Sequence, residues 1–107
     1  VSSHFLITRA GQLIQFVPMH LRAWHAGISS FKGREECNDF SIGIELEGCD
    51  EEEFAASQYE TLIELINFLK QEYLIIEDNI VGHSSIAPGR KTDPGPHFKW
   101  NLLKSSI

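Results

Sequence analysis

The sequence has few of the features that mark a membrane, secreted or nucleic-acid-binding protein. No run approaches the ~20 consecutive apolar residues that a transmembrane helix needs. The two cysteines, Cys37 and Cys49, are too few for the disulfide framework of a small secreted domain. The chain has 9 lysine and arginine residues against 15 aspartates and glutamates, and its net charge of −6 argues against nucleic acid, whose phosphates need basic patches. These absences favour a cytoplasmic protein whose partner is neither nucleic acid nor a membrane.

The apolar content is sufficient for one small domain. Of the 107 residues, 42% are hydrophobic and 10% are aromatic, as in ordinary globular proteins with a modest core. The acidic run from Asp50 to Glu53 lacks the alternating oxygen ligands and central glycine of an EF-hand loop, so we interpret it as a solvated loop. Val1 leads directly into strand-like sequence with no starting methionine. We therefore expect a single, monomeric domain over residues 1–107, in a chain that is incomplete.

Alternation of apolar and polar residues predicts the strands. Ser3 to Thr8 and Gln12 to Val17 are β-rich runs separated by a turn that contains Gly11, which predicts a hairpin. Residues 19–40 show no steady period and are predicted to form an ordered loop. Ser41 to Glu47 alternates, so one face of this strand is apolar and the other presents two carboxylates.

After these strands, apolar residues recur at the spacing of an α-helix. Ser57 is a suitable N-cap, and Glu60 three residues later completes a capping box. An apolar stripe of about five turns then follows, made of Tyr59, Leu62, Ile63, Ile66, Leu69 and Tyr73. Asn79 to His83 is predicted to be a short strand, and His97 to Lys104 a short helix that begins near Pro96. The element order indicates a mixed α/β domain, a sheet with helices packed against it.

The loop from His83 to Pro96 contains the most informative chemistry. It offers the imidazole of His83 and the carboxylate of Asp93, two ligand types that zinc takes in proteins. Its prolines make the backbone bent and stiff, so the loop is able to bring both side chains to one ion. Each residue also has a plainer interpretation, His83 as a structural or surface histidine and Asp93 as the opening of an Asp-Pro turn. Lys91 is either a solvated cation or an electrophile that stabilises an oxyanion near the metal.

Other candidate residues lie upstream. A glutamate such as Glu45, in an otherwise apolar strand, must face a polar cavity or a partner, because an unpaired buried carboxylate is costly. As a general base it would take a proton from metal-bound water and return it to the leaving group. Trp24 is either a core aromatic or a platform for a sugar ring, and His25 and His4 are candidates for orienting a substrate. Together these residues favour metal-assisted hydrolysis.

Four runs, in order along the chain, have a pattern that resembles a known family. They are Val1–His4, Arg22–Gly27, Cys37–Gly48 and, in the last loop, Gly82–His83 with Lys91–Pro96. The runs resemble the AmpD-type 1,6-anhydro-N-acetylmuramyl-L-alanine amidases of the amidase-2 and peptidoglycan-recognition family. The resemblance implies a central, mostly antiparallel β-sheet flanked by α-helices, with Zn²⁺ in a cleft. It further implies the site residues, which are His83 and Asp93 as zinc ligands, Glu45 and Lys91 in catalysis, and Trp24 and His25 in the muropeptide groove.

The implied reaction is cleavage of the amide between the lactyl group of N-acetylmuramic acid and L-alanine in (anhydro)muropeptides, during cytoplasmic cell-wall recycling. The chain departs from the family pattern in two ways. The family's first zinc ligand is a histidine in an early strand, and no part of this sequence matches that strand. Glu36 stands where the family has an arginine that meets the stem peptide. A catalytically silent muropeptide-binding module and an inactive fragment therefore remain as alternatives.

Overall fold

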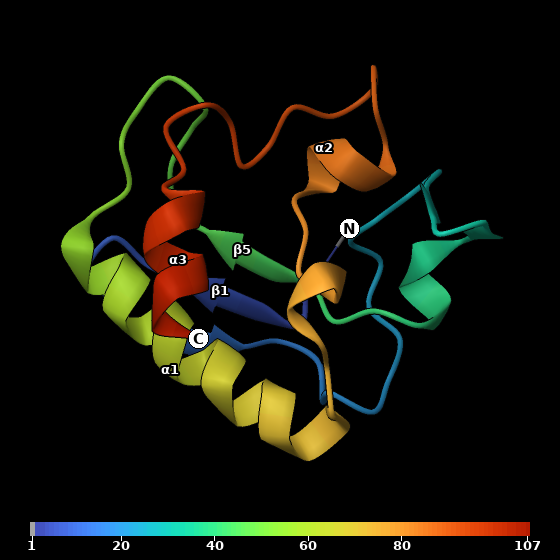
Figure 1. Cartoon of the computed structure of the whole chain (residues 1–107), viewed down its shortest axis with the longest axis horizontal. Coiled ribbons are helices and arrows are strands. Elements are labelled where there is room, and N and C mark those ends of the chain that lie inside the picture. Colours follow the sequence, from blue (N-terminus) through green and yellow to red (C-terminus); the bar gives the residue numbers. More distant parts are fainter. Residues whose placement is uncertain (1) are drawn as a thin grey trace.

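The first two strands form the hairpin that the sequence predicts (Figure 1). In this computed structural model, which describes residues 2–107 and so excludes Val1 of the first family run, β1 (Phe5–Ile7) pairs antiparallel with β2 (Leu13–Gln15). Gly11 closes the turn with a φ of +83°, a value that favours glycine. β5 (Ile44–Leu46), a shorter strand than predicted, pairs parallel with β1, and the sheet order is β2-β1-β5.

The segment predicted to be a loop, residues 19–40, contains a second, very small sheet. β3 (Ser30–Phe31) pairs antiparallel with β4 (Arg34–Glu35), and a 3-10 helix, η1 (Cys37–Asp39), follows. Strands of two residues are too short to produce a periodic pattern, which explains why the sequence did not reveal them. β3 lies against α2 (His83–Ile86), so this segment is brought to the loop that contains the candidate metal ligands.

The helix α1 (Ala56–Tyr73) packs on one face of the sheet together with α3 (Trp100–Ser106) (Figure 1). The larger core cluster joins β1, α1 and the C-terminal segment, and consists of Ile7, Tyr59, Leu62, Ile66, Phe98 and Leu103. Ile44 and Leu46 pack against this cluster, which confirms the predicted apolar face of the third strand. Four residues of the predicted helical stripe are buried, Ile63 is half-buried and Tyr73, at its end, is exposed. The mixed α/β class is confirmed.

The start of α1 differs from the prediction. The helix begins at Ala56 with Ala55 as its N-cap, so Ser57 and Glu60 do not form a capping box. The Ser57 hydroxyl instead donates to the carbonyl of Arg9 at 2.9 Å, which ties the helix to the β1–β2 turn. The side-chain oxygen of Gln58 accepts the Ala55 N–H at 2.9 Å in its place. The Ser57 side chain therefore makes a long-range hydrogen bond to the hairpin and not the helix cap that the local sequence predicted.

Two further elements were predicted wrongly. Asn79 to His83 is not a strand, since a 3-10 helix, η2 (Glu77–Asn79), precedes an extended stretch and His83 already begins α2. Ile80 has extended dihedral angles (φ −104°, ψ 107°), but no strand among residues 2–107 pairs with this stretch. α3 begins at Trp100, later than predicted, and the N–H of its N-cap Lys99 donates to the hydroxyl of Tyr59 at 3.0 Å.

Candidate active site

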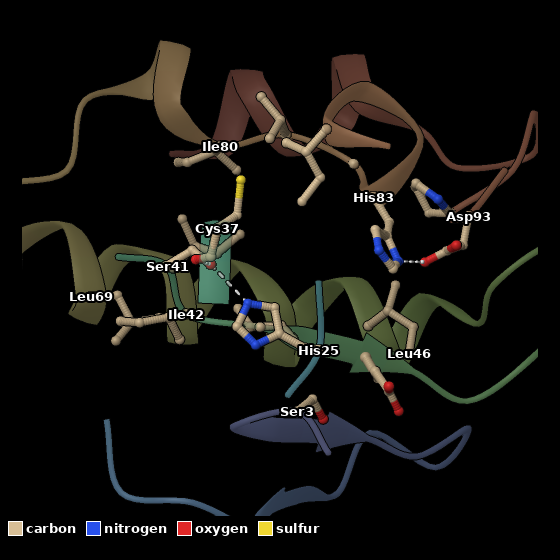
Figure 2. Close-up of a pocket in the computed structure, with 18 of the residues that line it drawn as sticks. Ser3, His25, Cys37, Ser41, Ile42, Leu46, Leu69, Ile80, His83 and Asp93 are labelled. Atoms are coloured by element: carbon tan, nitrogen blue, oxygen red, sulfur yellow. Dashed lines mark hydrogen bonds and ion pairs between the residues drawn. The ribbon is translucent and has the colours of Figure 1, made fainter. Parts of the chain in front are cut away.

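A cavity of about 1020 Å³ lies along the edge of β5 that no described strand covers (Figure 2). Its walls come from β5 and the preceding residues, from the inner face of α1, and from the extended stretch before His83. Four of the candidate residues line it, namely His25, Glu45, His83 and Asp93. The structure thus brings to one cavity residues that are up to 68 positions apart in the sequence (93 − 25).

His83 and Asp93 meet at one end of this cavity (Figure 2). The distance from His83 Nδ1 to Asp93 Oδ2 is 3.2 Å. The Ser84 N–H donates to the carbonyl of Asp93 at 3.0 Å, so the two ends of the loop are held together by the backbone as well. A Cβ on Gly82 would lie 2.6 Å from Pro94 Cδ, which shows why a glycine precedes the histidine.

The two side chains fit a shared metal ion. Two ligand atoms on a tetrahedral zinc lie about 3.3 Å apart, given bonds of about 2.0–2.1 Å. The observed 3.2 Å suits that arrangement, and it also suits a hydrogen bond from a doubly protonated imidazole. In the described part of the chain, no third histidine, cysteine, aspartate or glutamate completes a metal-binding cluster with them. His83 and Asp93 are therefore two residues that could hold a metal ion, and other ligands would have to complete the site.

The other nitrogen of His83 is also engaged. Nε2 lies 2.9 Å from the carbonyl oxygen of Ala26. A carbonyl only accepts hydrogen bonds, so Nε2 must bear the proton, and in the neutral ring Nδ1 keeps its lone pair on the side of Asp93. A metal-binding histidine commonly has this arrangement, in which the second nitrogen donates to a backbone carbonyl.

The two glutamates of the β5 segment have different environments. Glu45 lies on the face of β5 opposite Ile44 and Leu46, its side chain is exposed, and it lines the cavity. This agrees with the predicted need for a polar surrounding. Glu47 accepts the N–H of Arg9 at 2.8 Å, and it therefore holds the β1–β2 turn.

His25 occupies another part of the cavity, beside Ser41 (Figure 2). Its Nε2 lies 2.8 Å from Ser41 Oγ, and that hydroxyl donates to the carbonyl of Cys37 at 2.6 Å. Burial lowers the pKa of His25 from 6.5 to about 4, and the charge that His4 can take adds to the effect. His25 is therefore neutral at pH 7, with Nε2 as donor to Ser41 and Nδ1 buried without a partner in residues 2–107.

His4 does not take part in the cavity chemistry. It is 1% exposed, its Nδ1 accepts the Gly43 N–H at 3.1 Å, and its Nε2 donates to the carbonyl of Leu21 at 2.7 Å. Both ring nitrogens are thus used within the fold. The prediction that His4 orients a substrate is wrong, because the ring is a buried connection between loop and strand.

Trp24 and Lys91 lie outside the cavity lining. Trp24 is 59% exposed, so it is not a core aromatic. The guanidinium of Arg22 stacks over its ring at 4.1 Å from the centroid and pairs with Asp39 at 2.8 Å. Lys91 is exposed, and its backbone N–H donates to Ala87 at 3.0 Å.

Sequence reasoning missed two residues that hold the Trp24–His25 loop. Asn38 is 6% exposed, and its Oδ1 accepts the backbone N–H groups of His25 at 3.0 Å and of Ala26 at 2.8 Å. Arg90 donates to the carbonyls of Ala26 and Ile28. Neither residue has a local signal in the sequence, because both act on a segment that is distant along the chain.

Comparison with known proteins identifies the family. Residues 1–96 match the family model for N-acetylmuramoyl-L-alanine amidase, amidase-2. Over 107 residues the chain is 56% identical to 1,6-anhydro-N-acetylmuramyl-L-alanine amidase AmpD from Citrobacter freundii, covering 100% of this chain and 57% of that protein. It is 40% identical over 119 residues to N-acetylmuramoyl-L-alanine amidase AmiD from Escherichia coli K12, covering 96% of this chain and 43% of AmiD.

Solved structures agree. A crystal structure of a selenomethionine AmpD derivative matches with a TM-score of 0.97 and 52% identity, covering 100% of this chain and 60% of that one. The complex of E. coli AmiD with anhydro-N-acetylmuramic acid-L-Ala-D-gamma-Glu-L-Lys matches with a TM-score of 0.94 and 38% identity. This match covers 98% of this chain and 47% of AmiD in that structure. The chain thus spans 57–60% of the AmpD relatives and less than half of AmiD. No described helix is long and apolar enough to cross a membrane. This chain belongs to the amidase-2 family of N-acetylmuramoyl-L-alanine amidases.

Proposed function

We propose that the chain forms most of the catalytic domain of a zinc-dependent amidase that cleaves the amide between the lactyl group and L-alanine in (anhydro)muropeptides. The observation that supports this most directly is the convergence of His83 Nδ1 and Asp93 Oδ2 at 3.2 Å, in a cavity that Glu45 also lines. The AmiD relative is solved in complex with an anhydromuropeptide substrate, which is the substrate class proposed here.

The proposed mechanism assigns a role to each side chain. His83 and Asp93 would hold the zinc, which when bound would supply Lewis-acid polarisation and lower the pKa of a water. Glu45 would serve as the general base that takes a proton from the attacking water and as the acid that returns it to the leaving amine. Lys91 helps to stabilise the oxyanion and Trp24 offers an exposed ring to the sugar, while neutral His25 forms a wall of the cavity.

We also propose that the third zinc ligand comes from a strand outside residues 1–107, which pairs with the open edge of β5. Two observations support this. No third ligand completes the pair among the described residues, and the chain covers only 57% of its AmpD relative. By itself the chain should then hold zinc weakly, since structural and catalytic zinc sites take at least three protein ligands. We also propose a cytoplasmic location, because Cys37 and Cys49 are both free thiols and a reducing compartment keeps thiols in that state.

Cleavage of an anhydromuropeptide by the chain with its upstream segment restored tests this function. We expect Glu45→Gln to lower kcat by roughly 10²–10⁴-fold, the usual contribution of a general base, while zinc content is unchanged. Glu47→Gln is the matched control, because a glutamine oxygen can still accept the Arg9 N–H. Full activity of Glu45→Gln would remove Glu45 from the mechanism, and no zinc in the active protein would remove the metal.

A second candidate function is a silent muropeptide-binding module. The absence of a third ligand in the described chain favours it. Calorimetry of the 107-residue chain distinguishes the two. A module binds muropeptide equally well before and after treatment with a chelator, whereas loss of binding together with the metal contradicts the module.

A further inference from the structure

We propose that Asn38 and Arg90 are positioning residues for His83, and that they act through the backbone of the loop 25–28. The proposal rests on the zinc site proposed above. It concerns neither ligands nor groups that touch the substrate. It concerns the peptide unit that fixes which nitrogen of His83 faces Asp93.

The central contact is the carbonyl of Ala26. It accepts from His83 Nε2 at 2.9 Å and from Arg90 Nη2 at 2.6 Å. A carbonyl oxygen has two lone pairs, so these two donors use its full capacity. The imidazole is thereby held with its proton on Nε2 and its Nδ1 directed at Asp93, 3.2 Å away. If this carbonyl moved, the ring would lose the contact that sets its orientation and its tautomer.

Asn38 holds the loop from one side. Its side chain is 6% exposed, and Oδ1 accepts two successive N–H groups, those of His25 and Ala26, at 3.0 and 2.8 Å. Both peptide planes that flank residue 25 are therefore tied to one buried oxygen. Because the peptide N–H of Ala26 and its carbonyl bracket the same residue, fixing the one limits the movement of the other.

Arg90 holds the loop from the other side. Its guanidinium donates to the carbonyl of Ile28 as well, from Nη2 at 2.8 Å and from Nε at 3.2 Å. Gly27, between the two bound carbonyls, has a φ of +64°, and a Cβ there would lie 2.9 Å from Arg90 Nη2. Only glycine therefore permits both the left-handed backbone and the close approach of the guanidinium. The planar fork of arginine suits two carbonyls in a way that a lysine ammonium does not.

This arrangement connects two parts of the proposed site. The loop that fixes His83 also contains His25 and follows directly on Trp24. A single backbone segment therefore positions a metal ligand at one end and the candidate substrate platform at the other. Loss of either Asn38 or Arg90 should disturb both. Outer contacts of this kind typically contribute 10–100-fold to metal affinity.

The test measures the zinc affinity of the chain with its upstream segment restored, by competition with a chromogenic chelator. We expect Arg90→Ala and Asn38→Ala to weaken zinc binding by about 10–100-fold. Asn38→Asp keeps the oxygen acceptor and should restore binding, and Arg90→Lys should not. Arg34→Ala and Asn67→Ala are the matched controls, since Arg34 stacks on Phe40 and Asn67 bonds to Ser106, and neither side chain has a hydrogen bond to this loop among residues 2–107. Wild-type affinity in both Arg90→Ala and Asn38→Ala overturns the proposal.

A second measurement separates this proposal from the zinc site itself. Hydrogen exchange of the His25 and Ala26 amides in the metal-free chain should accelerate in Asn38→Ala and recover in Asn38→Asp. In the zinc-loaded chain, the His83 Nε2 proton should exchange faster in Arg90→Ala than in Arg34→Ala. If the wild-type chain with its upstream segment binds no zinc, the proposed function fails whatever the exchange rates show. If zinc binds but neither exchange rate responds, the function stands and the positioning role fails.

Discussion

Gly43 has a sharply testable role, because it makes room for the His25 ring. A Cβ at position 43 would lie 2.4 Å from His25 Cγ, 2.6 Å from Cδ2 and 2.8 Å from Cβ. Gly43 is not among the residues with positive φ, so an alanine meets no strain from its own backbone. Any cost of Gly43→Ala must therefore come from the collision. The ring has little freedom to retreat, since the His25 N–H is held by Asn38 and Nε2 by Ser41.

The magnitude follows from two terms. Forcing one extra carbon into a packed site costs about 1–3 kcal/mol, and losing the His25–Ser41 hydrogen bond costs about 1 kcal/mol. We expect Gly43→Ala to lower the free energy of unfolding by about 2–4 kcal/mol. This is a large fraction of the roughly 5–15 kcal/mol that stabilises a typical domain. With a urea m-value of about 1–3 kcal/mol per molar, the unfolding midpoint should fall by about 1 M or more, with m unchanged.

A double-mutant cycle with His25→Ala identifies the cause. Removing the ring should reduce the cost of Gly43→Ala by at least about 1 kcal/mol, because the two residues are in contact. Gly33→Ala is the matched control. Its Cβ meets no atom within 4 Å, and its φ of +83° predicts a cost of about 1–2 kcal/mol that is the same with or without the His25 ring. Additive costs for Gly43 and His25, or a cost of Gly43→Ala below that of Gly33→Ala, would refute the reasoning.

Three other predictions concern single side chains. The pKa of His25 is lowered to about 4 in the folded chain against 6.5 unfolded, so its neutral form favours folding above pH 6.5 and this contribution is lost as pH falls toward 4. The loss of unfolding free energy between pH 7 and pH 4, measured with urea, should be smaller in His25→Gln by roughly 1–2 kcal/mol, because solvent screens a half-buried ring and reduces the full effect of the shift. Equal losses in the two proteins would contradict this. Gln58 is 0% exposed and donates to the carbonyls of Ile7 and Glu47. Gln58→Leu should therefore lower the free energy of unfolding, measured by calorimetry, by about 2–4 kcal/mol. The same change at the exposed Gln71 should alter it by no more than about 0.5 kcal/mol. Trp24 is 59% exposed, so Trp24→Ala should change the free energy of unfolding by less than about 1 kcal/mol. The same variant should bind muropeptide more weakly in titration calorimetry. An affinity equal to that of the wild type would show that Trp24 is not part of the substrate groove.

Local pattern was most reliable where the burial of side chains is regular. The alternation of residues 41–47 correctly indicated that Ile44 and Leu46 face the core and that Glu45 lies opposite them. The spacing of apolar residues in α1 likewise identified its buried face. Pattern failed at Ser57, because that hydroxyl binds the distant Arg9 carbonyl rather than its own helix end. It failed again at Asn79–His83, since a strand exists only where another strand supplies hydrogen bonds.

The sequence by itself determined which residue types are present in each run, and these were enough to predict the family, the mixed fold class and the residues His83, Asp93 and Glu45. Runs of this kind are informative because the side chains that share one face of a strand or helix are set by their spacing along the chain. Only the tertiary structure decided that His83 and Asp93 lie 3.2 Å apart and that Trp24 is exposed. It also decided that Asn38 and Arg90 form hydrogen bonds to the loop 25–28. The contacts among these join residues 10 to 64 positions apart, for which a single sequence has no periodic signal.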